Sequence, residues 1–173
     1  MKISISQIIA FSFVVFFLSI LWLGLKNNNN YDTKSLIGNK ISNFQLSSIY
    51  NNEFISNQVL KENKFTLINF FASWCTPCRA EHKYLLNLSN ENKEIKIIGI
   101  NFKDKKNNAI NFLKELGNPY DFVGKDIEGR ISISFGIYGI PESILIDNDL
   151  TVIKKIVGPI DQIQFNEILK LIQ

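Results

Sequence analysis

The hydrophobic residues of this chain form one long stretch near the start of the sequence and several shorter runs after residue 36. Residues 3–25 contain no charged side chain, and a helix that rises about 1.5 Å per residue can cross a hydrocarbon core of about 30 Å over this length. No small-residue cleavage site of the Ala-x-Ala kind precedes Lys26. We therefore interpret residues 1–25 as a retained membrane anchor and not as a cleaved signal peptide.

The segment after this stretch is polar and has no hydrophobic periodicity. Residues 26–36 include four consecutive asparagines, a composition typical of a flexible tether. The remaining residues, 37–173, have the length of one ordinary domain. The sequence thus predicts an anchor, a tether and a single folded domain.

Strand and helix patterns alternate within this domain. Short alternations within residues 41–55 predict an initial strand pair. Residues 65–71 form a nearly unbroken β-favouring run, typical of a central strand that is covered on both faces. Residues 95–100 predict a second buried strand, and helical periodicity covers residues 76–89 and 105–116. The order strand, helix, strand, helix indicates a right-handed crossover between parallel strands.

Each of these two predicted helices has an apolar stripe along one face. In the first helix the stripe consists of Ala80, Tyr84, Leu85 and Leu88. In the second helix it consists of Ala109, Phe112, Leu113 and Leu116, and Gly117 and Pro119 end the helix.

The last part of the chain predicts a β-hairpin and a final helix. Residues 142–146 and 151–157 are β-rich, and the turn-forming residues 147–149 join them. Asp161 is the expected N-cap of the final helix, with Gln164 three residues later. The apolar contacts of that helix are expected from Ile163, Ile168, Leu169 and Ile172.

The charge of the chain does not point to a polyanionic partner. The formal net charge is +3, and residues 26–173 have 18 basic and 16 acidic side chains, because the anchor removes only Lys2 from the 19 basic residues. The lysines alternate with glutamate and asparagine and form no basic stripe, the feature expected of a nucleic-acid binder. We therefore expect an ordinary solvated surface and no nucleic-acid partner.

The two cysteines of the chain lie three positions apart, so they cannot be the scattered framework of a disulfide-stapled fold. The segment Trp74-Cys75-Thr76-Pro77-Cys78 falls where the predicted central strand gives way to a helix. Unpaired N–H groups at a helix N-terminus favour the Cys75 thiolate, the form that attacks a disulfide. Pro77 suits the first helical turn, and Cys78, one turn inside, is expected to be the resolving thiol.

A structural zinc site is the alternative interpretation of a Cys-x-x-Cys pair. Such a site requires four Cys or His ligands, and the chain offers Cys75, Cys78 and one histidine, His82. We therefore expect no metal and no other cofactor. A metal-binding module that uses these three residues is the competing hypothesis from a different functional class.

Two segments resemble a known family. Residues 70–82, Phe-Phe-Ala-Ser-Trp-Cys-Thr-Pro-Cys-Arg-Ala-Glu-His, are similar to the active-site segment of the thioredoxin-like proteins of cytochrome c maturation, the CcmG/DsbE type. Residues 136–147, Gly-Ile-Tyr-Gly-Ile-Pro-Glu-Ser-Ile-Leu-Ile-Asp, are similar to that family's segment around its cis-proline. The resemblance extends over residues 37–173. It implies a thioredoxin-like α/β fold, with a central mixed sheet flanked by helices and an extra N-terminal strand pair.

The resemblance also implies roles for individual residues. Cys75 and Cys78 match the redox pair, and Pro141 matches the cis-proline that faces the disulfide. Ile140 is then expected to pair with an extended substrate segment, as in strand addition. Glu142 matches an acidic residue near the redox site, where a negative charge disfavours the thiolate, although read alone it is a surface glutamate at a strand end.

Other residues of the two segments are expected to support the redox pair. Trp74 is expected to contact the substrate together with the cis-proline segment. Asn69 lies six residues before Cys75, where ordinary thioredoxins have a buried acid, and an amide cannot accept a proton. The Thr76-Pro77 order departs from the Pro-Thr order that family members often have, and this dipeptide tunes the reduction potential.

The sequence and the resemblance together predict a thiol:disulfide oxidoreductase that reduces the disulfide of apocytochrome c before haem attachment. The expected electron donor is a transmembrane thiol carrier, because an oxidising compartment supplies no soluble reductant. The expected location is the bacterial inner membrane, as a single-pass protein whose catalytic domain faces the periplasm. Lysines flank the apolar stretch on both sides, so this orientation follows from the cysteine chemistry alone. A general extracytoplasmic reductase is the closest alternative.

Overall fold

The structure is a computed structural model that describes residues 4–26, 36–92 and 94–173. The chain divides between Asp32 and Thr33 into two compact units, which are considered separately. Most of the predicted tether, residues 27–35, lies outside the described residues.

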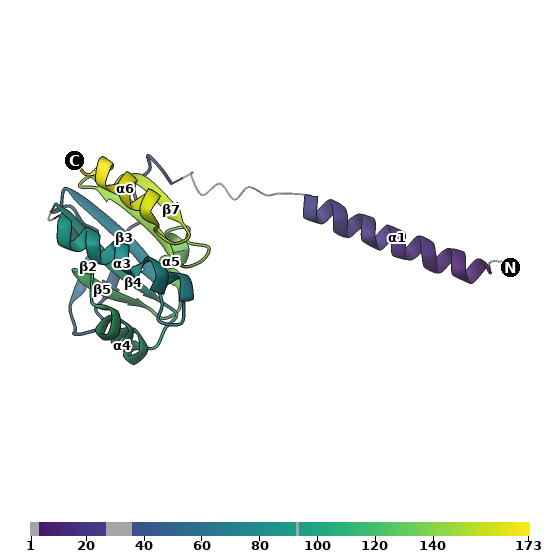
Figure 1. The fold of residues 1–173 in the computed structure, drawn as a ribbon, viewed down its shortest axis with the longest axis horizontal. Helices are drawn as coiled ribbons and strands as arrows, with labels where there is room; N and C mark the ends of the chain where they lie inside the picture. The colour runs from purple at the N-terminus through teal and green to yellow at the C-terminus, as the bar shows by residue number, and fades with distance from the viewer. Residues whose placement is uncertain (1–3, 27–35, 93) are drawn as a thin grey trace. The chain divides into compact units, whose positions relative to one another are not determined.

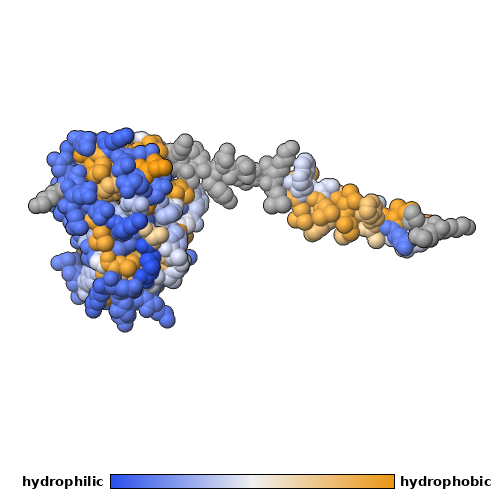
Figure 2. Space-filling view, viewed as in Figure 1, coloured by the Kyte–Doolittle hydropathy of each residue, from blue (hydrophilic) through white to orange (hydrophobic). Residues whose placement is uncertain are grey.

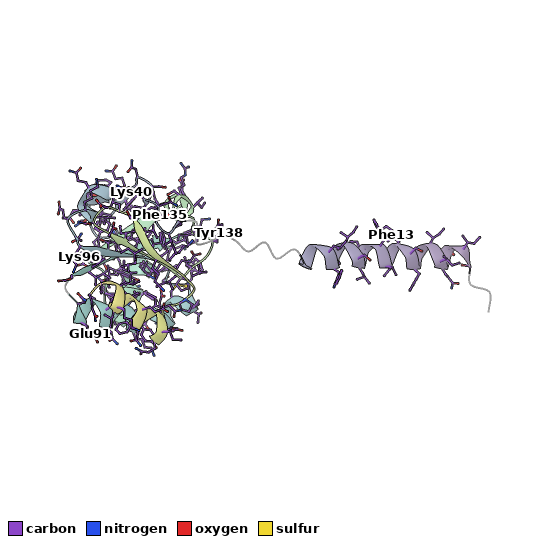
Figure 3. The ribbon with its side chains drawn as sticks, turned by 90° about the horizontal axis from the view of Figure 1, so that it is seen from above. Phe13, Lys40, Glu91, Lys96, Phe135 and Tyr138 are labelled. Carbon is purple, nitrogen blue, oxygen red and sulfur yellow. A yellow bond between two sulfur atoms is a disulfide. The ribbon has the colours of Figure 1, made fainter. Side chains whose placement is uncertain are left out.

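The described residues of the first unit, 4–26, form the helix α1 (Ile5–Lys26). Its residues Ile5–Gly24 have a mean hydropathy of 2.2 and are long and apolar enough to cross a membrane. Figure 2 shows hydrophobic side chains along most of α1, and Figure 3 shows Phe13 projecting from it. A candidate membrane span therefore occupies the predicted anchor.

A five-stranded sheet organises the second unit (Figure 1), in the order β5-β4-β3-β6-β7. Its strands are β3 (Phe65–Phe71), β4 (Ile95–Phe102), β5 (Phe122–Asp126), β6 (Glu142–Asp147) and β7 (Val152–Val157). β4 runs parallel to both β3 and β5, whereas β6 runs antiparallel to both β3 and β7. The predicted central strand, the parallel crossover and the C-terminal hairpin are therefore confirmed.

Two hydrophobic cores lie on the two faces of the sheet, because successive side chains of a strand point to opposite faces. On β3, Leu67 and Phe71 belong to one core, and Ile68 and Phe70 belong to the other. The first core is covered by α3 (Thr76–Glu91), α4 (Lys106–Leu116) and α6 (Gln162–Leu171). The second is covered by the antiparallel pair β1 (Gln45–Ser47) and β2 (Phe54–Ser56), with α2 (Asn57–Leu60) and α5 (Arg130–Ser134).

The predicted buried face of α3 is partly wrong. Ala80 is exposed, and the buried positions are Cys78, Glu81, His82, Leu85 and Leu88. These positions follow the i, i+3, i+4, i+7 spacing of one helical face, counted from Cys78. The hydrophobic pattern missed this face because two of its members are polar.

The final helix begins as predicted, but one of its expected contacts is absent. The Asp161 side chain accepts hydrogen bonds from the N–H groups of Ile163 and Gln164, as expected of an N-cap. The Ile163 side chain itself is exposed, and Phe165 is buried in its place.

Candidate redox site

The redox pair occupies the turn between β3 and α3. Cys75 is the N-cap of α3 and forms a disulfide with Cys78, with the two Cα atoms 5.3 Å apart. The Cys78 N–H donates to the Cys75 Sγ atom at 3.2 Å. Thr76 and Pro77 form the first helical turn between the two cysteines and are exposed. The sulfur of Cys75 therefore lies where the unpaired N–H groups of a helix favour a negative charge.

Both cysteines are nearly buried, whereas Trp74 beside them is exposed. The relative exposure is 4% for Cys75, 2% for Cys78 and 58% for Trp74. The indole Nε1 of Trp74 donates to the carbonyl of Lys103 at 3.2 Å. The Trp74 ring is thus held beside the redox pair by the loop after β4, and its predicted contact with the substrate stays a prediction.

A buried carboxylate fixes the turn from the same loop. The carboxylate of Asp104 accepts from both the N–H and the hydroxyl of Ser73, at 2.7 and 3.0 Å. It also accepts from the Asn101 amide at 3.1 Å and from the Lys105 N–H at 2.8 Å. Asp104 therefore joins the redox turn, the end of β4 and the start of α4, a role that the sequence analysis did not identify.

A second buried carboxylate, Glu81, lies on the inward face of α3. It is one helical turn beyond Cys78 on the same face of the helix. Its Oε1 accepts from the Asn69 amide at 2.8 Å, and its Oε2 accepts from the Ile160 N–H at 2.8 Å. The site therefore contains a buried acid. This acid is on the helix α3 and not at the strand position that Asn69 occupies.

All the hydrogen-bonding groups of the Asn69 amide have partners. Its Nδ2 donates to Glu81 and to the Ser143 hydroxyl, at 2.8 and 3.0 Å. Its Oδ1 accepts from the Tyr120 hydroxyl at 2.8 Å. Because the Tyr120 hydroxyl donates to the Asn69 oxygen, the Asn69 nitrogen is the atom that faces Glu81.

Burial changes the acidity of this network. It raises the pKa of the Glu81 carboxyl from 4.5 to about 7, against the opposing hydrogen bonds from Ile160 and Asn69. The pKa of Tyr120 is raised well above its usual 10.0, by burial first and by the charge of Glu81 second. A carboxyl with a pKa near neutrality can accept and release a proton under ordinary conditions.

His82, the third residue of the metal-binding hypothesis, points to a different partner. Its Nε2 donates to the carbonyl of Gly117 at 2.8 Å, and its ring packs edge-on against Phe112. Burial lowers the pKa of His82, and the nearby charge of Arg79 lowers it further, whereas the bond to Gly117 opposes this effect. Among the residues that the structure describes, no group of three His, Cys, Asp or Glu side chains could hold a metal.

The cis-proline segment lies before β6. The Ile140–Pro141 peptide bond is cis, as the resemblance implied, and the Pro141 carbonyl accepts from the Gly158 N–H at 3.0 Å. The side chain of Ile140 is half-buried and packs against the core cluster that includes both cysteines. Within the described part of the chain, the backbone N–H and C=O of Ile140 have no hydrogen-bond partner.

The interpretation of Glu142 as a surface glutamate is wrong, because its side chain is buried. Glu142 begins β6, an inner strand, and it pairs with Phe70 on one side and with Val157 on the other. Its Oε1 accepts from the N–H groups of Tyr138 and Gly139, both at 3.0 Å. Its Oε2 lies 3.0 Å from the Nζ of Lys155, so a positive charge accompanies the negative one that was expected to disfavour the thiolate.

The fold brings both predicted segments to one end of the sheet. The redox turn follows β3, the cis-proline segment precedes β6, and the two strands are paired from Phe70 and Glu142 onward. The sequence analysis missed Glu81, Asp104 and Lys155. The spacing of three between Cys78 and Glu81 on a helix was the one available signal.

Comparison with known proteins agrees with this geometry. The Redoxin family model matches residues 36–172. The thiol:disulfide interchange protein CycY of Rhizobium leguminosarum bv. viciae is 48% identical over 106 residues, which cover 61% of this chain and 56% of that protein. The thiol:disulfide interchange protein DsbE of Escherichia coli K12 is 40% identical over 136 residues, which cover 76% of this chain and 72% of that protein.

A solved structure supports the fold assignment. The thioredoxin domain of a thiol-disulfide oxidoreductase from Bacteroides vulgatus superimposes with a TM-score of 0.69 at 20% identity, covering 79% of this chain and 98% of that one. The predicted thioredoxin-like fold is therefore confirmed. With a Cys-x-x-Cys disulfide at the expected turn, the chain belongs to the Redoxin family and is a thiol:disulfide oxidoreductase of the DsbE type.

Proposed function

We propose that this chain is a membrane-anchored reductase that opens the disulfide of apocytochrome c before haem attachment. The observation that carries the proposal is the position of Cys75, an N-cap sulfur at the same sheet end as the unpaired backbone of Ile140. The assignment to apocytochrome c comes from the resemblance of residues 70–82 and 136–147 to the proteins of cytochrome c maturation.

The reaction begins from the dithiol form. The Cys75 thiolate attacks one sulfur of the substrate disulfide, forms a mixed disulfide and releases the other substrate sulfur as a thiolate. Cys78 then attacks the Cys75 sulfur, which frees the second substrate thiol and leaves the Cys75–Cys78 disulfide. Two electrons have passed to the substrate, and a thiol donor must return them to the protein.

Glu81 gives the second step a proton acceptor. Cys78 is a buried thiol that has to lose its proton before it attacks, and Glu81 lies one turn further along the same buried helical face. With a pKa of about 7, its carboxyl can take up that proton near neutral pH.

The backbone of Ile140 offers the substrate a docking edge. An extended segment beside it could bond to its N–H and C=O in the manner of an added strand. Trp74 is exposed on the β3 side of the same sheet end and supplies an apolar contact.

The proposed location is the bacterial inner membrane. We place the N-terminus in the cytoplasm, α1 across the bilayer as a retained anchor, residues 26–36 as a tether and residues 37–173 in the periplasm. A transmembrane thiol carrier is the proposed donor. A general extracytoplasmic reductase is the second candidate, because pairing through the Ile140 backbone requires no particular substrate side chain.

The test is the redox state of the pair in cells, followed by trapping. We expect Cys75 and Cys78 to be largely reduced at steady state. The Cys78→Ala variant cannot resolve mixed disulfides, so c-type apocytochrome and a transmembrane thiol protein should remain attached to Cys75. The Cys75→Ala/Cys78→Ala variant is the control and should capture neither.

Three results would contradict this proposal. A pair that is fully oxidised at steady state would favour a disulfide donor. Capture of many unrelated periplasmic proteins, without enrichment of apocytochrome, would favour the general reductase. A stoichiometric metal in the reduced protein would favour the metal-binding module.

A further inference from the structure

Lys155 has a buried side chain that the proposed redox reaction does not use. It lies on β7, and its side chain and that of its partner Glu142 are each only 2% exposed. Lysine is almost never buried to this extent unless its charge is paired. Lys154, the preceding residue, instead pairs with Glu167 nearer to the surface.

The ion pair holds the loop before the cis-proline through several groups. The Lys155 Nζ donates to the Gly136 carbonyl at 2.6 Å and lies 5.4 Å from the centre of the Tyr138 ring. Through Glu142, the same pair also holds the N–H groups of Tyr138 and Gly139. The loop from Gly136 to Gly139 is therefore tied to β6 and β7 by one pair of charges.

These contacts act on the exposed end of a loop whose middle is already anchored, because Ile137 is buried in the second core and its N–H donates to the Ser132 carbonyl at 3.0 Å. Tyr138 is 70% exposed and projects from the surface of the unit (Figure 3). Gly136 has a φ of +62°, a turn conformation that side chains other than glycine disfavour. The exposed end of the loop, Tyr138 and Gly139, depends more on hydrogen bonds than on packing for its shape.

Stability alone does not explain a buried ion pair at this place. The desolvation of two charges often cancels their attraction, and apolar residues of similar volume are frequently at least as stabilising. A buried pair can instead specify one geometry. Here the specified geometry is that of residues 136–139, directly before Ile140.

We propose that Lys155 is a positioning residue that holds loop 136–139 so that the Ile140 backbone is presented to an extended disulfide substrate. The inference rests on the proposed function, since it concerns how the same site binds its substrate. Lys155 touches neither sulfur in this role. Its loss should therefore weaken the binding of extended substrates more than it slows thiol exchange itself.

The test compares two substrates on the full-length chain in detergent micelles. A thiol reductant in excess returns two electrons to the Cys75–Cys78 pair after each turnover, and the rate measured without the protein is subtracted. One is a synthetic peptide with an oxidised Cys-x-x-Cys-His motif, which can pair along a backbone. The other is bis(2-hydroxyethyl) disulfide, which is too small to do so. For Lys155→Met we expect the KM for the peptide to rise about tenfold, with kcat and the rate on the small disulfide within about twofold of wild type.

Two further variants separate positioning from general damage. Lys155→Arg retains a charge that can bond to both Glu142 and Gly136, so it should restore the KM for the peptide to within about twofold of wild type. Lys154→Met removes the neighbouring lysine of β7 and should leave both substrates unaffected. If Lys155→Met does not fold, Lys155→Met/Glu142→Gln leaves no lone buried charge. Its kcat/KM for the peptide divided by its rate on the small disulfide should fall about tenfold, because this ratio cancels any change in Cys75 reactivity that follows the loss of Glu142.

An unchanged KM for the peptide, or an equal loss on both substrates, would overturn the role of Lys155. The proposed function is judged separately, from the wild-type chain. If wild type reduces the peptide no better than it reduces insulin, the apocytochrome assignment fails. The role of Lys155 is then judged by the ratio of the variant's KM to the wild-type KM, measured with insulin in place of the peptide.

Discussion

Glu81 shows how the chemistry of this site depends on one side chain that looks ordinary in the sequence. Asn69 occupies the strand position where thioredoxins have a buried acid. The sequence alone therefore indicated no proton acceptor at this site. The structure places a buried carboxyl on α3, with the Glu81 carboxylate 2.8 Å from the Asn69 amide, and we propose that this group accepts the proton of Cys78. The amide thus orients a carboxyl that the helix contributes.

The raised pKa of Glu81 predicts how stability changes with pH. Between pH 4.5 and about 7 the folded chain holds a proton at Glu81 that the unfolded chain has lost, so this group lowers stability as pH rises through that range. At 1.36 kcal/mol per pKa unit, the loss is on the order of 3 kcal/mol. Glu81→Gln cannot ionise, so its free energy of unfolding should rise relative to wild type from about pH 5 to about pH 8.

Thermal and urea unfolding of the oxidised full-length chain in detergent measure this difference. His82 and the other titrating groups are common to both proteins, so they cancel in the comparison. Glu91→Gln, an exposed change on the same helix, should leave the pH dependence of wild type unaltered. If the free energy of unfolding of Glu81→Gln changes with pH in parallel with that of wild type, Glu81 ionises normally.

The sequence identified site residues whose chemistry is rare and missed those whose chemistry is common. Cys75, Cys78 and Trp74 stand out because few side chains can do what they do, and they lie where they were expected. Glu81 and Glu142 did not stand out, since most glutamates are on surfaces. Their burial follows from which helix face or strand position they occupy, and only the packed structure determines that.

At the scale of elements, Asp104 is the junction on which the redox turn depends. Asp104→Ala would leave the N–H groups of Ser73 and Lys105 and the Asn101 amide without their acceptor. Each buried donor that loses its partner costs about 1–3 kcal/mol, and entering water recovers part of this. We expect the free energy of unfolding to fall by about 3 kcal/mol, as measured by urea denaturation.

An exposed aspartate provides the matched control for this change. Asp149→Ala, in the β6–β7 turn, should change the free energy of unfolding by no more than about 0.5 kcal/mol. A loss of less than about 1 kcal/mol in Asp104→Ala would mean that the junction is not stabilising.

The elements that the sequence predicted are those with strong hydrophobic periodicity. The central strand, the helices α3 and α4 that follow it in the sequence, and the C-terminal hairpin are of this kind. β5 and α5 were not predicted, because both are short and β5 contains Gly124 and ends in Lys125 and Asp126. A Cβ atom at Gly124 would lie 3.0 Å from the Cβ of Leu46, so this glycine admits β1, a tertiary requirement that local propensity does not reveal.

At the scale of the whole molecule, the fate of α1 decides where the redox unit works. If α1 is a retained anchor, the intact mass of the purified protein should include residues 1–25, and alkaline carbonate should not extract it from membranes. Phe13→Arg/Phe16→Arg should weaken membrane insertion, because each arginine at the centre of a span costs about 2.5–3.5 kcal/mol.

The matched control for this prediction keeps the segment apolar. Phe13→Leu/Phe16→Leu should remain in the membrane fraction like wild type. A mature protein that begins after residue 25 would instead identify α1 as a cleaved signal sequence. Labelling Cys75 in intact cells with a membrane-impermeant maleimide reports which side of the bilayer the redox unit faces.

The unpaired backbone of Ile140 has a consequence for the order of events in turnover. Among the described residues, nothing pairs with the N–H or the C=O of Ile140, and these two groups can bind only one extended chain at a time. The thiol donor and the disulfide substrate would therefore compete for the Ile140 backbone. One of them must dissociate before the other can bind. Turnover should follow ping-pong kinetics. An excess of substrate should inhibit the reduction of the protein by its donor, and an excess of donor should inhibit the reduction of the substrate.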